Sequence, residues 1–77
     1  MIRAYVLIEI LPGACGDVVK KIRGIEGVKS AEAATGPYDV IAYVEVPNVK
    51  ALGNLSFVKI QGIEGVKRTL TCVVTVF

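Results

Sequence analysis

The sequence has no histidine, no tryptophan and only two cysteines. Without histidine, the chain lacks the side chain that most often serves as a base near neutral pH. Cys15 and Cys72 form neither a C-x-x-C motif nor a cysteine–histidine pair, so neither a metal site nor a redox centre is expected. Both cysteines fall among apolar neighbours in the pattern, which predicts that they are buried core residues. The sequence therefore predicts no catalytic residue, no metal and no cofactor, and a protein that is not an enzyme.

Long apolar runs and clusters of like charge are also missing. The first strand-like segment follows Met1 directly and contains Arg3 and Glu9, which excludes a signal peptide and a membrane span. The net charge is only +2, and acidic residues are interleaved with the basic ones. A stripe of cations that could follow a phosphate backbone is therefore not expected. These features predict a cytoplasmic protein that contacts no membrane and binds no nucleic acid directly.

The chain is short, with 77 residues, and has room for one domain that spans residues 1–77. A domain of this size buries only ~60% of its unfolded surface and is marginally stable alone. Disulfides, metals and self-association are the usual supplements. Because the cysteine content argues against the first two, the sequence predicts self-association.

An internal repeat is the most informative feature of the sequence. The segment 24–29, GIEGVK, recurs intact at 62–67, and the segment 4–6, AYV, recurs at 42–44 with the same offset. Two matches at one offset indicate that one structural unit is present twice. Two copies are too few for a solenoid, so the halves are expected to share one core.

Each half has the pattern of a strand, a helix and a strand. The predicted elements are strands at Ile2–Ile10, Val28–Thr35, Tyr38–Val46 and Val66–Phe77, a helix at Ala14–Arg23, and a helix that begins after the N-cap Asn48 and ends before Gly62. Gly24 is expected to end the first helix in the left-handed conformation. This βαββαβ order predicts an α+β, ferredoxin-like fold, in which both helices cover one face of an antiparallel sheet. The strands that open the two halves lie in the middle.

The helices are expected to be amphipathic. The inward face of the first is predicted to carry Cys15, Val18, Val19 and Ile22, and that of the second Val49, Leu52, Ser56, Phe57 and Ile60. Leu55 and Val58 fall off the second inward face. Apolar residues in that position suggest either contacts with further subunits or an imprecise amphipathic pattern.

The sheet face without helices is expected to be apolar. Side chains alternate along a strand, so Tyr5 and Leu7 face away from the helices together with Ile41 and Tyr43. On the last strand, Thr69, Thr71 and Val73 are expected on this same face. A broad apolar patch on a small domain usually marks a partner surface. The sequence therefore predicts a face-to-face homodimer whose interface contains Tyr5, Leu7, Ile41, Tyr43 and Val73.

The turn Thr35–Asp39 could hold a ligand. A carboxylate at Asp39, beside an apolar strand, needs backbone N–H groups, a cation or a ligand ammonium as its partner. Glycine and proline in the turn also allow a purely structural role. Together with the hydroxyls of Thr69 and Thr71, this turn could bind a small zwitterion.

These residues resemble those of a known family. Gly36-x-Tyr38-Asp39 before an apolar strand, Gly65-Val66, and Thr69-x-Thr71 in the last strand are similar to the effector-binding (RAM) domain of Lrp/AsnC transcription regulators. The resemblance runs from Arg3 to Val76. It implies a stand-alone form, because the helix-turn-helix domain of those regulators has no counterpart in this sequence.

The resemblance implies a homodimer that assembles into an octamer or a larger ring and binds an amino-acid effector between dimers. The ligand contacts that it implies are Gly36, Tyr38, Asp39, Thr69 and Thr71. It also implies that full-length Lrp/AsnC regulators are potential partners through mixed assembly.

Three other functions remain open on this fold. A small dimeric enzyme of the monooxygenase or isomerase type is the main alternative, although such sites usually need histidine or tryptophan. A metal chaperone needs two soft ligands in the first loop, where only Cys15 is present. An RNA-recognition module is suggested by Tyr5 and Tyr43 on central strands, but few basic residues accompany them.

Overall fold

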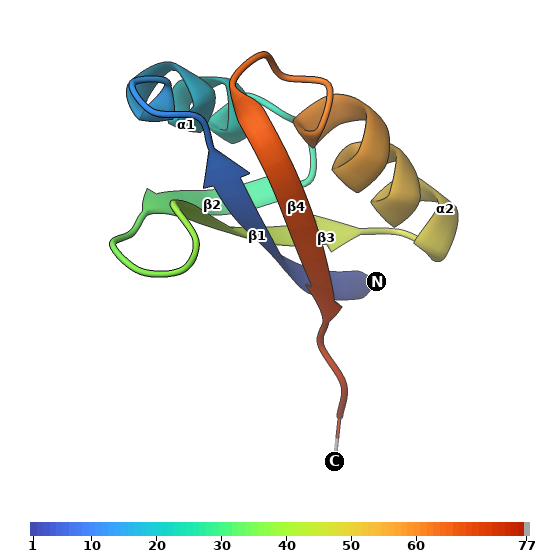
Figure 1. The fold of residues 1–77 in the computed structure, drawn as a ribbon. Helices are drawn as coiled ribbons and strands as arrows, with labels where there is room; N and C mark the ends of the chain where they lie inside the picture. Colours follow the sequence, from blue (N-terminus) through green and yellow to red (C-terminus); the bar gives the residue numbers. More distant parts are fainter. Residues whose placement is uncertain (77) are drawn as a thin grey trace.

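The computed structural model describes residues 1–76 and has the predicted ferredoxin-like architecture (Figure 1). The elements are β1 (Ile2–Ile10), α1 (Cys15–Arg23), β2 (Val28–Ala33), β3 (Val40–Val46), α2 (Val49–Gly53), η1 (Asn54–Ile60) and β4 (Val66–Val73). The four strands form one antiparallel sheet in the order β2-β3-β1-β4, so the strands that open the two halves are central, as predicted. Both helical segments lie on one face of this sheet.

The core lies between the helices and one phase of the two central strands. Alternate residues of β1 and β3 are buried there, namely Ala4, Val6, Ile8 and Ile10 with Val40, Ala42, Val44 and Val46. They pack against Val18, Val19 and Ile22 of α1, as the helical pattern predicts, and against Leu52, Leu55 and Ile60 of the second helical segment. The alternate residues of the strands and the inward face of α1 therefore pack together in a single core.

The second helical segment differs from the prediction. Leu55 is only 3% exposed, whereas Val49 and Phe57, which were expected to face inward, are each 71% exposed. The cause is a change of winding, because Asn54–Ile60 is a π-helix. Its bonds span five residues, as in the bond from Gln61 N to Ser56 O. The wider turn rotates Phe57 outward and brings Leu55 onto the core, while Val58 is exposed as predicted.

The glycines of the repeated segment have a different role from the predicted one. Gly24 ends α1 with φ −81° and is therefore not left-handed. The positive φ angles occur at the second glycine of each copy, with +98° at Gly27 and +101° at Gly65. A Cβ on Gly27 would lie 3.0 Å from the side chain of Leu55, and one on Gly65 would lie 2.8 Å from that of Ala14. Each half thus packs its glycine against the helical segment of the other half.

The predicted strand ends are too long on either side of the β2–β3 turn. β2 ends at Ala33 and β3 begins at Val40, because Ala34 N donates to Asp39 O at 2.9 Å and closes the connection. β4 ends at Val73, and the predicted strand end at Phe77 lies outside the described residues. Asn48 caps α2 as predicted, since its side chain accepts a bond from Ala51 N. Within residues 1–76, no helix is long and apolar enough to cross a membrane.

Candidate functional site

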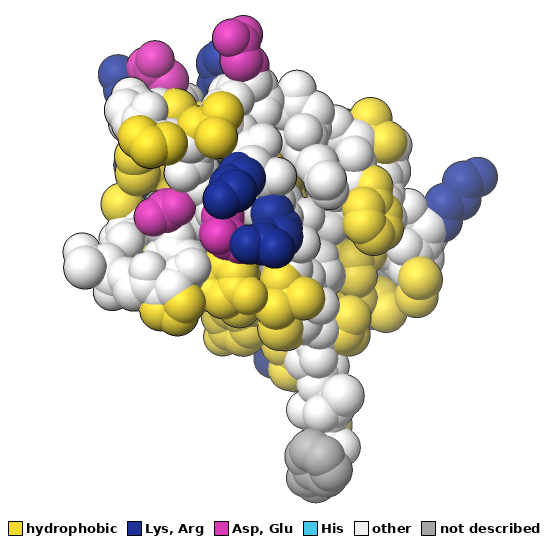
Figure 2. Space-filling view, viewed as in Figure 1, with side chains coloured by type: hydrophobic (Ala, Val, Ile, Leu, Met, Phe, Trp, Pro, Cys, Tyr) yellow, Lys and Arg dark blue, Asp and Glu magenta, His cyan; other side chains and the backbone are white. Residues whose placement is uncertain are grey.

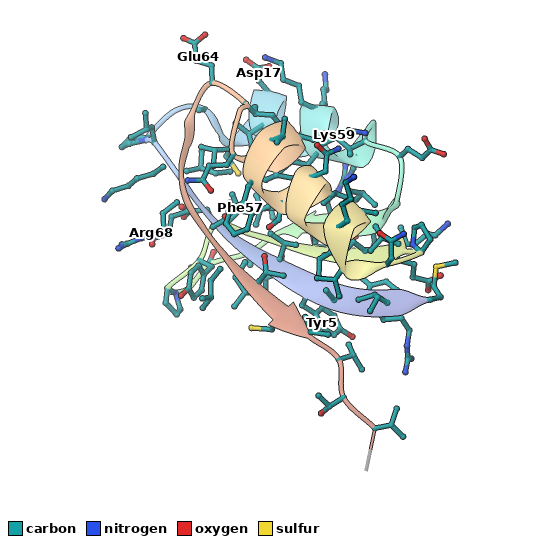
Figure 3. All side chains as sticks on the ribbon, turned by 90° about the vertical axis from the view of Figure 1, so that its right-hand side faces the viewer. Tyr5, Asp17, Phe57, Lys59, Glu64 and Arg68 are labelled. Atoms are coloured by element: carbon teal, nitrogen blue, oxygen red, sulfur yellow. The ribbon has the colours of Figure 1, made fainter. Side chains whose placement is uncertain are left out.

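The face of the sheet that the helices leave uncovered is called the open face here. On β1 and β3 it carries Tyr5, Leu7, Ile41 and Tyr43, as the alternation predicts. Tyr5 is 46% exposed and points away from the helical layer (Figure 3). Its ring lies against that of Tyr43, with centroids 5.2 Å apart. The Tyr43 hydroxyl donates to Glu45 Oε2 at 2.9 Å, and burial together with this carboxylate raises the pKa of Tyr43.

The prediction for β4 had the wrong phase. Thr69 pairs with Ile8, Thr71 with Val6 and Val73 with Ala4, and residues directly opposite each other share a face. The two threonines and Val73 therefore lie on the helix side. Leu70, which is 48% exposed, and Cys72 take their place on the open face, opposite Leu7 and Tyr5. The apolar strip continues across β4, but through residues that were not predicted to be part of it.

The threonine hydroxyls bond to the second helical segment. Thr71 Oγ1 lies 2.7 Å from Ser56 Oγ, and Thr69 Oγ1 donates to Gln61 Oε1 at 3.3 Å. Because β4 is an edge strand beside η1, these side chains face polar groups there, which explains the phase that the sequence pattern left ambiguous. Cys72 is exposed and Cys15 is half-buried, so the prediction that both cysteines are buried is wrong.

The turn before β3 fixes Asp39 to the end of β1. Asp39 Oδ2 accepts from Ile10 N at 2.8 Å, and Asp39 N donates to Ile8 O at 2.9 Å. Of the three partners that the sequence allows for this carboxylate, the structure shows a backbone N–H. Gly36 is exposed, whereas Tyr38 and Asp39 are half-buried.

The predicted ligand residues are only partly gathered together. Gly36, Tyr38 and Asp39 share one turn, and Thr69 lies at the same end of the sheet because Ile8 pairs with both Val40 and Thr69. Thr71 is two residues farther along β4 and is bonded to Ser56. The geometry therefore groups the turn with Thr69 more closely than with Thr71.

A charged pair that the sequence analysis missed lies beside this turn. Arg68 Nε donates to Glu9 Oε2 across the β1–β4 pair. The hydrogen bond from Arg68 lowers the pKa of Glu9, and the same bond raises the pKa of Arg68. Figure 2 shows a small group of acidic and basic side chains bordered by apolar surface. Opposite charges on two pairing strands are the signal that would have revealed it, once the register was known.

Comparison with known proteins decides the family. The model of the Lrp/AsnC ligand binding domain matches residues 3–76. The chain belongs to this family. The match takes in the open face, the Gly36–Asp39 turn and both threonines of β4. The family is a regulatory class of ligand-binding domains and not a class of enzymes.

Two solved structures are similar to this chain over almost the whole length of both. TTHA0845 from Thermus thermophilus is 31% identical with a TM-score of 0.95, and the alignment covers 100% of this chain and 96% of that one. PHS023 from Pyrococcus horikoshii is 27% identical with a TM-score of 0.90, covering 100% and 93%. No curated protein matches the chain.

One longer regulator shares the fold. The transcriptional regulator NMB0573 from Neisseria meningitidis, solved as a complex with L-Met, is 20% identical with a TM-score of 0.88. The alignment covers 96% of this chain but only 49% of the regulator. At this identity, the likeness shows a shared fold alone.

The Glu9–Arg68 pair predicts a pH dependence of stability. Because the pKa of Glu9 is lowered in the folded state, the pair stabilises the fold above the ordinary value of 4.5 and loses this effect as the pH falls through the folded pKa. We expect the melting temperature to fall more between about pH 7 and about pH 3 in the wild type than in Arg68→Met. Circular dichroism melts measure both, with Lys29→Met as the control that keeps the pair. Equal losses in the wild type and Arg68→Met would contradict this.

Proposed function

We propose that the chain is a self-assembling amino-acid sensor of the Lrp/AsnC type. Two copies pair through their open faces, the pairs assemble into an octamer or a larger ring, and a small amino acid binds at the seams between pairs. The observation that carries this proposal is the uncovered apolar strip across β3, β1 and β4. Through these assemblies, the chain would also combine with full-length Lrp/AsnC regulators and change their response.

The composition of the open face supports the pairing. Tyr5, Ile41 and Leu70 are large apolar residues that remain between about two-fifths and half exposed in the single chain. Tyrosine suits such an interface, because its ring provides apolar area while its hydroxyl keeps a polar partner. A two-fold pair brings the same patch of each copy together, so one apolar surface is enough to form it. The apolar surface that pairing buries would add stability that the small core of a domain of this length does not supply.

The Gly36–Asp39 turn supports the amino-acid site. Asp39 would attract the ammonium group or a cationic side chain of the ligand, since backbone bonds already hold its carboxylate in place. The ligand carboxylate would be received by the Thr69 hydroxyl and by backbone N–H groups near Gly36. Thr71 would contribute its hydroxyl by giving up the hydrogen bond to Ser56 and bonding the ligand instead. The L-Met complex of the Neisseria regulator, which has the same fold, favours an amino acid as the ligand.

Isothermal titration calorimetry against a panel of amino acids tests the proposal. We expect at least one amino acid to bind, and Asp39→Asn to weaken its affinity about tenfold or more, because a charged partner is lost. Asparagine keeps an oxygen that can accept from Ile10 N, so the turn is expected to fold. Asp17→Asn, at an exposed position in the first turn of α1, is the matched control and should bind as the wild type does.

The assembly is read out in the same samples. A ligand that binds between subunits shifts the assembly, and the assembly shifts ligand affinity by the same factor. Sedimentation velocity with and without the bound amino acid should therefore give different sizes. The absence of heat across the panel, together with an unchanged size, would contradict the proposal.

A further inference from the structure

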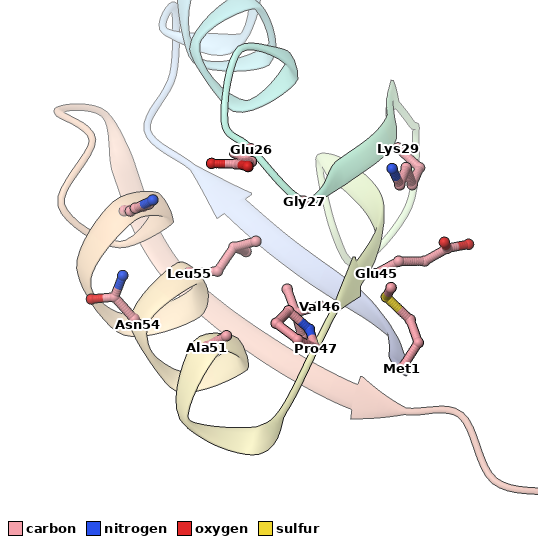
Figure 4. A pocket seen from close by; sticks show the side chains of 11 residues that line it. Met1, Glu26, Gly27, Lys29, Glu45, Val46, Pro47, Ala51, Asn54 and Leu55 are labelled. Atoms are coloured by element: carbon pink, nitrogen blue, oxygen red, sulfur yellow. The ribbon is translucent and has the colours of Figure 1, made fainter.

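A pocket of about 370 Å³ lies where β2 begins, β3 ends and the second helical segment passes over them (Figure 4). This volume is at the low end of the range for small-molecule sites, ~300–1,000 Å³. We call it the Glu26 pocket. It is at the opposite end of β3 from the Gly36–Asp39 turn.

The Glu26 pocket has apolar residues at its base. Leu55 points into it from η1, between Gly27 on one side and Ala51 and Val46 on the other (Figure 4). Gly27 brings its backbone close to Leu55 and Val46, since a Cβ there would lie 3.0 Å and 3.2 Å from those side chains. This packing keeps the base closed and free of charged side chains.

Charged groups of both signs surround this base. Glu26 contributes a carboxylate, and Lys29 and Lys59 contribute ammonium groups, while Glu45 also lines the pocket but its carboxylate accepts from Tyr43 on the open face. Figure 4 places Glu26 near Leu55, and Lys29 and Glu45 together on the far side. Groups of both signs are present, so the pocket suits a ligand that carries both charges better than a simple anion or a simple cation.

The internal repeat produces a second hollow that serves as a comparison. It is lined by Lys21, Glu64 and Gly65, which correspond to Lys59, Glu26 and Gly27 at the offset of the repeat. Its volume is about 510 Å³, and we call it the Glu64 pocket. At the offset of the repeat, Leu55 corresponds to Asp17, which lines the Glu64 pocket. The two pockets thus share the glutamate, the glycine and the lysine and differ at this sequence position, although Leu11, Pro12 and Ala14 also give the Glu64 pocket apolar lining.

We infer that the Glu26 pocket binds a small zwitterion with an apolar side chain. The side chain lies on Leu55, Val46 and Ala51. The ammonium group of the ligand pairs with Glu26, and its carboxylate pairs with Lys59, with both interactions strengthened by charge. β3 separates this site from the Gly36–Asp39 turn by ~20 Å at ~3.3 Å per residue. All of these contacts are made by residues of one chain, whereas the seam site lies between pairs.

Photo-crosslinking with a diazirine analogue of leucine tests the inference, because this probe is a zwitterion with an apolar side chain. The intact protein is irradiated with the probe, digested and analysed by mass spectrometry. We expect saturable labelling of the segment that contains Val46 and Leu55, and competition by excess L-leucine. Glu26→Gln should raise the probe concentration needed for half-maximal labelling about tenfold or more.

The repeat supplies the matched control. Glu64→Gln makes the same change in the Glu64 pocket and should leave the labelling of the Val46–Leu55 segment unchanged. Glu26 and Glu64 are both exposed, so neither variant disturbs the core. Labelling confined to residues 35–39 and 69–71 would overturn this inference while supporting the seam site. Labelling that is not saturable, or that falls equally in both variants, would also overturn it.

Discussion

Replacing Ile41 by aspartate is expected to separate the proposed pair into monomers. Ile41 lies on the open face opposite Leu7 and is 39% exposed in the single chain, so pairing would bury the remainder. An aspartate there would become an unpaired charge in an apolar interface, which costs about 3 kcal/mol or more. We expect the dissociation constant of the pair to rise about 100-fold or more. Sedimentation velocity over a concentration series measures this change.

The control for this variant is Val49→Asp. Val49 is 71% exposed at the start of α2, in the helical layer and not on the open face, and the substitution adds the same charge. It should leave the pair intact, and both variants should keep the circular dichroism spectrum of the wild type because neither residue belongs to the core. An Ile41→Asp protein that sediments like the wild type would show that the open face is not the pairing surface.

The repeat made most of the fold predictable. Two copies of a strand–helix–strand unit leave few ways to share a core, and the alternation in Ile2–Ile10 and Val40–Val46 then determines which side chains are buried. The bounds of β1 and the buried residues Val18, Val19 and Ile22 of α1 follow from the periodicity alone. These elements are central or amphipathic, so the core selects one phase for each of them.

The predictions of which side chains face the core are wrong in β4 and in the second helical segment, where packing against the core does not decide between the alternatives. β4 is an edge strand that alternates between threonine and the moderately apolar Leu70 and Cys72, so both phases were plausible in the sequence. Only the register with β1 decides between them. The second helical segment has no proline or other signal of its π-helical winding, and a regular helical period therefore put Phe57 in the place of Leu55.

The candidate site could be predicted only where all of its residues lie in one continuous segment. The Gly36–Asp39 turn is local, and its glycine, proline and aspartate indicated a constrained connection directly. The Glu9–Arg68 pair joins residues that are far apart in the sequence and needs the β1–β4 register. The Glu26 pocket combines the loop of the first half with the helical segment of the second, which the repeat implies only after the halves are packed.

Each half packs a glycine against the helical segment of the other half, so replacing one of these glycines should destabilise the fold. We expect the second large effect, a loss of stability, in Gly65→Ala. Gly65 has φ +101°, which costs a residue with a Cβ about 1–2 kcal/mol. The new Cβ would also lie 2.8 Å from the Cβ of Ala14 and 3.1 Å from Val18 Cγ2. Ala14 precedes α1 and has no flexible side chain that could move away, so overpacking adds about 1–3 kcal/mol. We expect a total loss of about 3 kcal/mol, a large share of the ~5–15 kcal/mol typical of domains.

Two further glycines separate the causes of this loss. Gly13 has φ +84° but no atom within 4 Å of an added Cβ, so Gly13→Ala should show the conformational cost alone, about 1 kcal/mol. Gly53 lies in a helix with φ −60° and is equally free of contacts, so Gly53→Ala should stabilise the protein by about 0.5–1 kcal/mol. Urea unfolding at one fixed protein concentration measures all three, since assembly would shift the apparent stability. If Gly65→Ala and Gly13→Ala lowered the free energy of unfolding equally, the close contact with Ala14 would not be the reason that position 65 needs glycine.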